Sequence, residues 1–470
     1  MTESQLQLRE FEALPQPSSC RLIDFEEAEV RPGIVSGTYI LIVRGTKPYL
    51  NMEVNLTPLV YIRQPEHWGI EVIGCLRGGI GLAAPTAPYI ASLGLSGTIG
   101  TQGIEVIGAT RSEKISVPPA ASGDFAAFLT KELLPSIPKV SGSGATADPA
   151  EQHNQYVLPT ASQLASWRAV FQGLLAGAWG PAHLQARMIS STYNVVQFLD
   201  TPTGRTYYVL MEGVPGRIPD PVDHPAGSVT ITEPPADCTR RGWGTYVFAA
   251  QPERALSLSA PHPFDDLETE VEAVEAFLAL GARTLLIAGT DRDQNTAEAP
   301  CKQSSRPFLE ADVSHTAESV FQMAFEEIYS SDASTWHLQF HGNASTARGC
   351  EDVDVFLSNG VEAAPAKLHT LAENIAAESR AKAPGGPILM VDVYDAPDDC
   401  ILRGTDNMQM RFASGRPHTS ICLGKDPEET SRFIHVEQSR DARRAFPTDP
   451  LATPGRNRGV VVAGILATFP

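Results

Sequence analysis

Two histidines and two nearby acids have the residue types and spacing of a metal site. His262 and His341 each follow an apolar run, and Asp266 and Glu268 come shortly after His262. Imidazole nitrogens and carboxylate oxygens are zinc ligands, and two histidines with one carboxylate leave a coordination position open for water. We expect His262 and His341 to bind zinc with Asp266 as the third ligand. Glu268 is the alternative third ligand, although an acid there also suits a first helical turn.

A second acid would have to deprotonate the metal-activated water. In "FIHVEQS", His435 and Glu437 are two residues apart, so a strand would present both on the same face. We assign Glu437 as the general base. His435 is either its hydrogen-bonding partner or a packing residue.

Three further residues are candidates for substrate binding: Arg292 in "GTDRDQN", and Asn407 and Arg411 in "GTDNMQMRFASG". Arginine pairs with carboxylates in a two-pronged geometry, so a substrate with a free carboxylate would use such a residue. Arg292 is the first choice because it follows a predicted strand. We place it with Glu437 among the catalytic residues as well.

The elements that carry these residues alternate between strands and helices. The predicted strands at 255–260, 336–340 and 433–437 are apolar, and amphipathic helices lie between them. This alternation predicts an α/β domain with a largely parallel or mixed sheet between helices. Ligands of such sheets bind where strands end at the carboxyl edge.

The chain divides by composition into four parts. Residues 1–140 are rich in short strand-like runs separated by Gly and Pro, which predicts an all-β sandwich or barrel. The sequence predicts a linker at residues 141–152, a connecting helix and hairpin at 153–234, and the α/β domain at 235–470. The N-terminal β domain could also mediate homo-oligomerisation.

Bulk composition excludes several classes of protein. Of 470 residues, 42% are hydrophobic and 19% charged, and the net charge of −19 disfavours nucleic-acid partners. No apolar run is long enough to span a membrane, and residues 1–17 lack the features of a signal peptide, so a cytoplasmic protein is expected. The seven cysteines form no CxxC pair. Their odd number indicates mostly free thiols, with room for one or two disulfides after residue 237.

The quoted motifs together resemble the zinc carboxypeptidase superfamily. "SAPHPFDD" before a helix, a later "QFHG" and a late "HVEQ" are similar to N-formylglutamate amidohydrolases and poly-γ-glutamate hydrolases. The resemblance covers about residues 235–450. It implies a zinc hydrolase of amide bonds, with ligand roles on His262, Asp266 or Glu268, and His341, and the base role on Glu437. The spacing from first histidine to acid is shorter in that superfamily, so both acids stay candidates.

Other functions are compatible with parts of the sequence. "APHPFDD" is similar to the "PHPDD" loop of zinc sugar de-N-acetylases, which would make Asp265 the base, although Phe264 is inserted. A non-catalytic binding or assembly protein is a further alternative. No GxSxG motif indicates a serine hydrolase, and no GxGxxG opens a helix after a strand. The sequence therefore favours a zinc-dependent amidohydrolase acting on an acyl amino acid or a peptide end.

Overall fold

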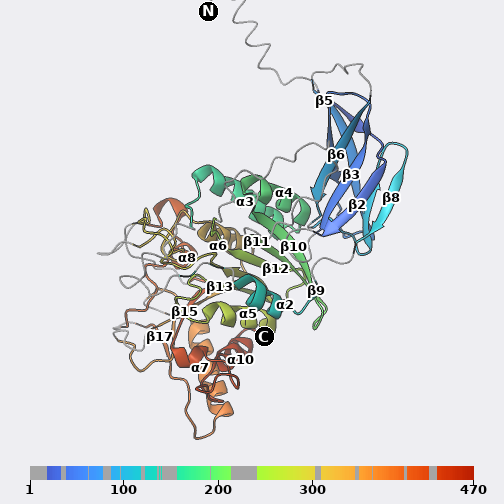
Figure 1. The fold of residues 1–470 in the computed structure, drawn as a ribbon. Helices are drawn as coiled ribbons and strands as arrows, with labels where there is room; N and C mark the ends of the chain where they lie inside the picture. Colours follow the sequence, from blue (N-terminus) through green and yellow to red (C-terminus); the bar gives the residue numbers. More distant parts are fainter. Residues whose placement is uncertain are drawn as a thin grey trace, which may run out of the picture. The chain divides into compact units, whose positions relative to one another are not determined.

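The structure is a computed structural model of the 470-residue chain, which divides into two compact units, Met1–Ala121 and Ser122–Pro470 (Figure 1). The described residues are 18–32, 39–61, 63–77, 86–95, 97–117, 122–134, 137, 139, 156–190, 192–212, 241–301, 308–343, 349–361, 364–395, 400–422 and 431–470. Each unit is described by itself.

The described residues of the first unit form strands in two sheets. The strands are β1 (Ser18–Leu22), β2 (Glu27–Pro32), β3 (Tyr39–Lys47), β4 (Met52–Pro58), β5 (His67–Arg77), β6 (Ala87–Gly94), β7 (Gly103–Ile107) and β8 (Ser112–Ser116). One sheet has the order β1-β5-β7-β8 with β4 also paired to β5, and the other has the order β2-β3-β6. Leu41 and Val43 from one sheet pack with Ile70 and Val72 from the other in one hydrophobic core. Two sheets around one core are compatible with the expected all-β domain, and its assignment as a sandwich or a barrel stays a prediction.

A mixed ten-stranded sheet forms the centre of the second unit, in the order β17-β16-β18-β15-β13-β14-β12-β11-β10-β9. Its strands are β9 (Ser122–Gly123), β10 (Tyr193–Asp200), β11 (Arg205–Glu212), β12 (Thr245–Ala249), β13 (Arg254–Ala260), β14 (Ala282–Ile287), β15 (Trp336–Gly342), β16 (Val355–Ser358), β17 (Val391–Val393) and β18 (Phe433–Gln438). The neighbours β14, β13, β15 and β18 run parallel, as buried apolar strands joined by helices do.

Two groups of helices pack on this sheet (Figure 1). Helices α3 (Ala161–Leu175), α4 (Trp179–Ile189), α6 (Val320–Ser331) and α8 (Met408–Ala413) form one group; α5 (Thr269–Leu280), α7 (Ala366–Lys382) and α10 (Arg458–Thr468) form the other. The shorter elements are α2 (Phe125–Ala127), η1 (Phe128–Leu133), η4 (His418–Ser420) and α9 (Arg440–Arg443).

The unit that carries the α/β sheet is larger than the sequence suggested. The hairpin of β10 and β11 was expected in a connecting region, but it pairs with β12 and continues the main sheet. Residues 122–134, expected in the N-terminal domain, lie in the second unit, where β9 pairs with β10. The expected linker, residues 141–152, lies outside the described residues.

The cysteines differ from the expectation of mostly free thiols. Three disulfides join Cys20 to Cys75, Cys301 to Cys422, and Cys350 to Cys400, while Cys238 lies outside the described residues. The partners are 50 to 121 residues apart, so the fold brings them together and local spacing gives no hint of the pairing. Disulfides persist in oxidising compartments, which weighs against the cytoplasmic expectation. Among the described helices, none has the length and apolar character that crossing a bilayer requires.

A thiol titration tests this pairing. In denaturant without reductant, the chain should show one reactive thiol, because six of its seven cysteines are paired, and all seven should react after reduction. Seven reactive thiols before reduction, in protein purified without reductant, would contradict the disulfides.

Candidate metal centre

The parallel strands deliver three of the expected site residues to one edge of the sheet. His262 lies two residues beyond β13, and His341 and Glu437 are the penultimate residues of β15 and β18. His341 and Glu437 are also direct neighbours in the register of the β15–β18 pair. Since parallel strands end at a common edge, residues 175 positions apart in the sequence (from 262 to 437) come together there.

The backbone of the loop after His262 places the side chain of Asp266 beside this histidine. Phe264 and Glu268 adopt left-handed backbone conformations, with φ of 72° and 71°, which is uncommon for residues with side chains. Asp266 lies between them, and its backbone N–H donates to the His262 carbonyl at 3.1 Å. Backbone strain of this kind is found where a chain must present a particular side chain.

The two candidate third ligands lie in different surroundings. Asp266 is buried, and its Oδ2 is 3.1 Å from Nδ1 of His262 and 3.3 Å from Nδ1 of His341. Glu268 instead forms ion pairs with Arg440 at 2.8 Å and Arg458 at 3.4 Å. Among the described residues, three overlapping groups have ligand atoms within 4.8 Å of one another: His262, Asp266 and His341; His262, Asp312 and His315; and His341, His435 and Glu437. The first of these groups contains both expected histidines and one of the two expected acids.

Each histidine is held through its other ring nitrogen. Nε2 of His262 is 3.0 Å from Asp312 Oδ1 and 2.8 Å from Ser314 Oγ. Nε2 of His341 is 2.9 Å from Gln339 Oε1. Hydrogen bonds of this kind fix the ring orientation and tautomer of metal-binding histidines. Both rings thus present Nδ1 to Asp266.

The charge states of His341 and Asp266 place two electron-rich atoms opposite each other. Burial lowers the pKa of His341 to about 4, so its ring is neutral near pH 7. Burial alone would raise the pKa of Asp266, but His262 and His341 hold it well below its usual value, so the carboxylate is ionised. With the His341 proton on Nε2, a bare Nδ1 faces a carboxylate oxygen at 3.3 Å. Such a contact is repulsive unless a cation bridges the two atoms.

Glu437 and His435 lie beside this cluster. The His341 and His435 rings are 4.3 Å apart, and His435 Nε2 is 3.7 Å from Glu437 Oε1. Burial and the charge of Asp266 raise the pKa of Glu437 to about 8. Within the described residues, Glu437 Oε2 and His435 Nδ1 are buried without a hydrogen-bond partner, which is costly unless a water or an ion binds there.

Arg292 also reaches the cluster. It forms ion pairs with Asp312 and, at 3.4 Å, with Asp265, and its NH1 lies 3.2 Å from Nδ1 of His262. Asp312 was not identified from the sequence, because "ADVSH" lies in an irregular segment without strand or helix periodicity. His315 Nδ1 is 2.9 Å from Asp312 Oδ1, and its ring stacks on Phe308.

Asn407 and Arg411 differ from their expected role in substrate binding. Asn407 caps α8 by accepting a hydrogen bond from Met410 N and donates to Gln339. The Arg411 guanidinium donates to the carbonyls of Thr405 and Ile421. Both side chains are buried, and these polar atoms bind within the protein rather than facing a ligand.

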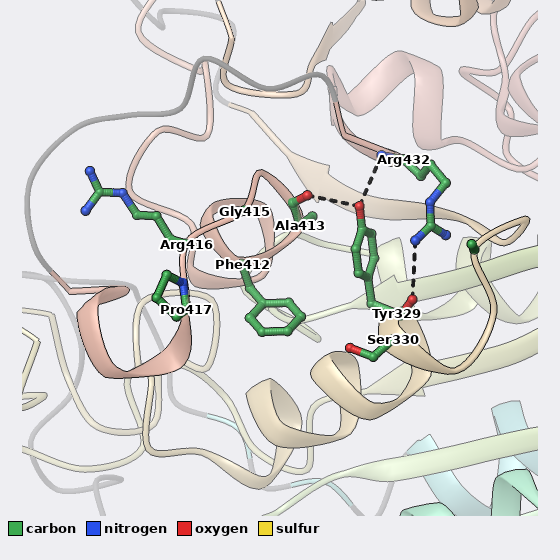
Figure 2. A pocket seen from close by; sticks show the side chains of 9 residues that line it. Tyr329, Ser330, Phe412, Ala413, Gly415, Arg416, Pro417 and Arg432 are labelled. Atoms are coloured by element: carbon green, nitrogen blue, oxygen red, sulfur yellow. Dashed lines mark hydrogen bonds between the residues drawn. The ribbon is translucent and has the colours of Figure 1, made fainter.

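A hollow of about 330 Å³ lies at the opposite edge of the sheet (Figure 2). It is lined by Tyr329 and Ser330 at the end of α6, by Phe412, and by Arg432 just before β18. Tyr329 donates a hydrogen bond to the Ala413 carbonyl there. Because Glu437 is near the other end of β18, this hollow is not part of the metal-binding cluster.

Comparisons with known proteins give no family assignment. No family model matches the chain, and no curated protein matches it. A putative carboxypeptidase A from Shewanella denitrificans is 14% identical with a TM-score of 0.26, over 48% of this chain and 59% of that one. A metallo-carboxypeptidase from Burkholderia cenocepacia is 9% identical with a TM-score of 0.26, over 96% of this chain and 97% of that one. Likenesses this weak establish neither fold nor activity, so the function must be inferred from the residues of the site.

The charges around His262 predict an unusual titration. Burial and Arg292 lower the pKa of His262, but Asp312 and Asp266 outweigh them and raise it to about 9. In protein stripped of metal, NMR should therefore show a histidine that stays protonated well above pH 7. Asp312→Asn should lower this pKa, because it removes a charge that stabilises the imidazolium. His341, neutral in the same spectra, is the internal control; an unchanged His262 pKa would contradict the assignment.

Proposed function

We propose that the protein is a zinc-dependent hydrolase that cleaves an amide bond in a small substrate bearing a carboxylate, such as an acyl amino acid or a peptide end. One observation carries the proposal: His262 Nδ1 and His341 Nδ1 both face the same oxygen of a buried, ionised Asp266. Two imidazole nitrogens and one carboxylate oxygen are the donor types of a catalytic zinc site.

The donor types favour zinc over other common metals. Two imidazoles and one carboxylate form a catalytic set of three protein ligands, whereas magnesium and calcium prefer oxygen ligands alone. When bound, zinc supplies Lewis acidity, which lowers the pKa of a water molecule and polarises a carbonyl group. Glu268 remains outside this set because of its pairs with Arg440 and Arg458.

Glu437 is proposed as the general base. Its Oε2 has no partner among the described residues, and its place beside His341 puts it next to the metal ligands. With a pKa of about 8, Glu437 is mostly protonated at pH 7 in the metal-free protein, and the positive charge of a bound metal would lower this pKa so that the carboxylate can act as a base. Glu437 would take a proton from the attacking water and pass it to the leaving nitrogen.

Arg292 is proposed to bind the substrate carboxylate. Its guanidinium is held by Asp312, while its contact with Asp265 is long, at 3.4 Å. A substrate carboxylate could replace Asp265 and bind in the two-pronged geometry that arginine favours. The same charge, close to His262, would stabilise negative charge developing at the reacting carbonyl group.

Two alternatives use residues of the same cluster. In a sugar de-N-acetylase, Asp265 rather than Glu437 would be the base, and Asp265 does lie at this edge. Ser314, His262 and Asp266 also line up as in a serine hydrolase, with Ser314 Oγ 2.8 Å from His262 Nε2. Ser314, however, is fully buried and hydrogen-bonds to Asp312, so its hydroxyl is not presented to a substrate.

Metal analysis tests the proposed site. The purified protein should contain about one zinc per chain, and His262→Ala and His341→Ala should each lose it because each removes a ligand. His369→Ala is the matched control, since His369 is about half exposed and pairs with Asp395 away from the cluster. Zinc-free wild-type protein that also fails to take up added zinc would instead favour a non-catalytic role.

Substitution of the candidate bases separates the two hydrolase proposals. Glu437→Gln should retain zinc but lower kcat by about 100- to 10,000-fold on acyl amino acids or peptides, the usual contribution of a general base. Asp265→Asn should have a smaller effect, mainly on KM, through its contact with Arg292. The reverse order of effects on kcat would support the de-N-acetylase mechanism.

A further inference from the structure

A chain of buried amide side chains leads away from His341. Gln339, Gln409 and Gln322 are each fully buried, on β15, α8 and α6. Gln339 Nε2 donates to Gln409 Oε1 at 3.2 Å, and Gln409 Nε2 donates to Gln322 Oε1 at 2.8 Å. Amide groups have distinct donor and acceptor ends, so a chain of them has a direction.

A backbone carbonyl fixes that direction. Gln409 Nε2 also donates to the Val313 carbonyl at 3.0 Å, and a carbonyl can only accept. The Gln409 oxygen must therefore face Gln339, which turns the Gln339 amine towards Gln409. The Gln339 oxygen is then left to face His341 Nε2, at 2.9 Å.

A backbone N–H fixes the same direction independently. Met410 N donates to Asn407 Oδ1 at 2.9 Å, which leaves the Asn407 amine to donate to the Gln339 oxygen. If Gln339 flipped, its oxygen would face the Gln409 oxygen and its amine would face the Asn407 amine. Both contacts would leave buried polar groups without a hydrogen bond, and each such group would destabilise the fold by about 1–3 kcal/mol.

We propose that Gln409 and Asn407 are positioning residues that act through Gln339 to hold the His341 proton on Nε2 and its Nδ1 lone pair towards Asp266. The ligand role of His341 rests on the function proposed above, whereas the tautomer does not. A flipped Gln339 would donate to Nε2 and move the proton to Nδ1. His341 would then donate to Asp266 and be unable to bind a metal.

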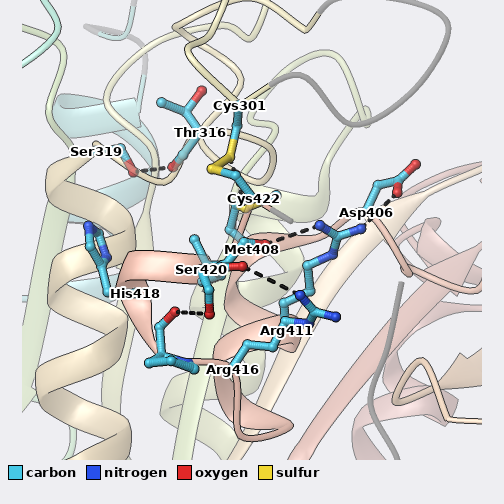
Figure 3. The surroundings of a disulfide bond; sticks show 12 residues. Cys301, Thr316, Ser319, Asp406, Met408, Arg411, Arg416, His418, Ser420 and Cys422 are labelled. Carbon is cyan, nitrogen blue, oxygen red and sulfur yellow. Dashed lines mark hydrogen bonds and ion pairs between the residues drawn. A yellow bond between two sulfur atoms is a disulfide. The ribbon is translucent and has the colours of Figure 1, made fainter. Parts of the chain in front are cut away.

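The segment that carries both positioning residues is firmly held. Met408, between them, donates its N–H to the Ser314 carbonyl at 2.8 Å. Its side chain packs with Cys301 in a small hydrophobic cluster at the Cys301–Cys422 disulfide, which Figure 3 shows beside it. A fixed backbone is required here, because the amide direction is set by backbone groups at Val313 and Met410.

The experiment compares Gln409→Met with Gln322→Met. Each replaces a fully buried amide by an apolar side chain of similar length, but Gln322 lies beyond the Val313 anchor. Zinc affinity is measured by chelator competition, and the His341 tautomer by ¹⁵N NMR of metal-stripped protein. Gln409→Met should weaken zinc binding about tenfold, as expected for residues that orient a ligand, and should populate the Nδ1–H form. Gln322→Met should change neither.

Asn407→Asp provides a second variant in case Gln409→Met does not fold. It keeps the oxygen that caps α8 but replaces the amine that binds Gln339 with a second acceptor, so it should also weaken zinc binding. Gln409→Glu retains an acceptor for Gln339 and should preserve the tautomer better than Gln409→Met.

The outcomes separate this inference from the proposed function. Wild-type tautomer and zinc affinity in both Gln409→Met and Asn407→Asp would overturn the positioning role. Wild-type protein that binds no zinc, but shows the Nε2–H tautomer and loses it in these variants, would overturn the zinc proposal and retain the positioning role.

Discussion

The site depends on one electrostatic constraint: electron-rich atoms of two imidazoles and a carboxylate are held together away from water. His262 Nδ1 and His341 Nδ1 lie 3.1 and 3.3 Å from the same Asp266 oxygen. Without a metal, the raised pKa of His262 and the nearby Arg292 supply the compensating positive charge, and further interactions hold the members of the group in place. Arg443 does so by donating to the carbonyls of Asp266 and Leu267, which fixes the loop that presents the carboxylate.

The parts of the site that follow local rules could be predicted from sequence. An apolar run ending in a histidine indicates a strand whose end reaches the carboxyl edge of the sheet, and by this rule His262 lies just beyond β13 and His341 near the end of β15. The period of two in a strand places His435 and Glu437 on one face. The choice between Asp266 and Glu268 depends on loop backbone conformation, which residue types alone do not determine.

The remaining features depend on contacts between distant segments. Asp312 contacts His262, which is 50 positions away in the sequence, and Gln409 donates to the carbonyl of Val313, which is 96 positions away. No periodicity marks either pair. The sequence left room for one or two disulfides after residue 237, where two of the three lie, but it gave no indication of the pairing or of Cys20–Cys75. Asn407 did carry a local signal: an Asn before "MQMRF" is a favourable helix N-cap, which explains why its side chain is used for structure rather than for a ligand.

The two histidines are supported by different chemistry, and the difference has a consequence for metal binding. Asp312, a carboxylate, binds His262 and contributes to its pKa of about 9, whereas a neutral amide binds His341, whose pKa is about 4. If a carboxylate contacted the second nitrogen of each histidine, it would raise the pKa of both rings, and both would be protonated near neutral pH. Protons would then compete with the metal at both ligands. Because Gln339 orients His341 without adding charge, one ligand stays deprotonated near neutral pH. Only the proton on His262 then has to be displaced when the ion binds.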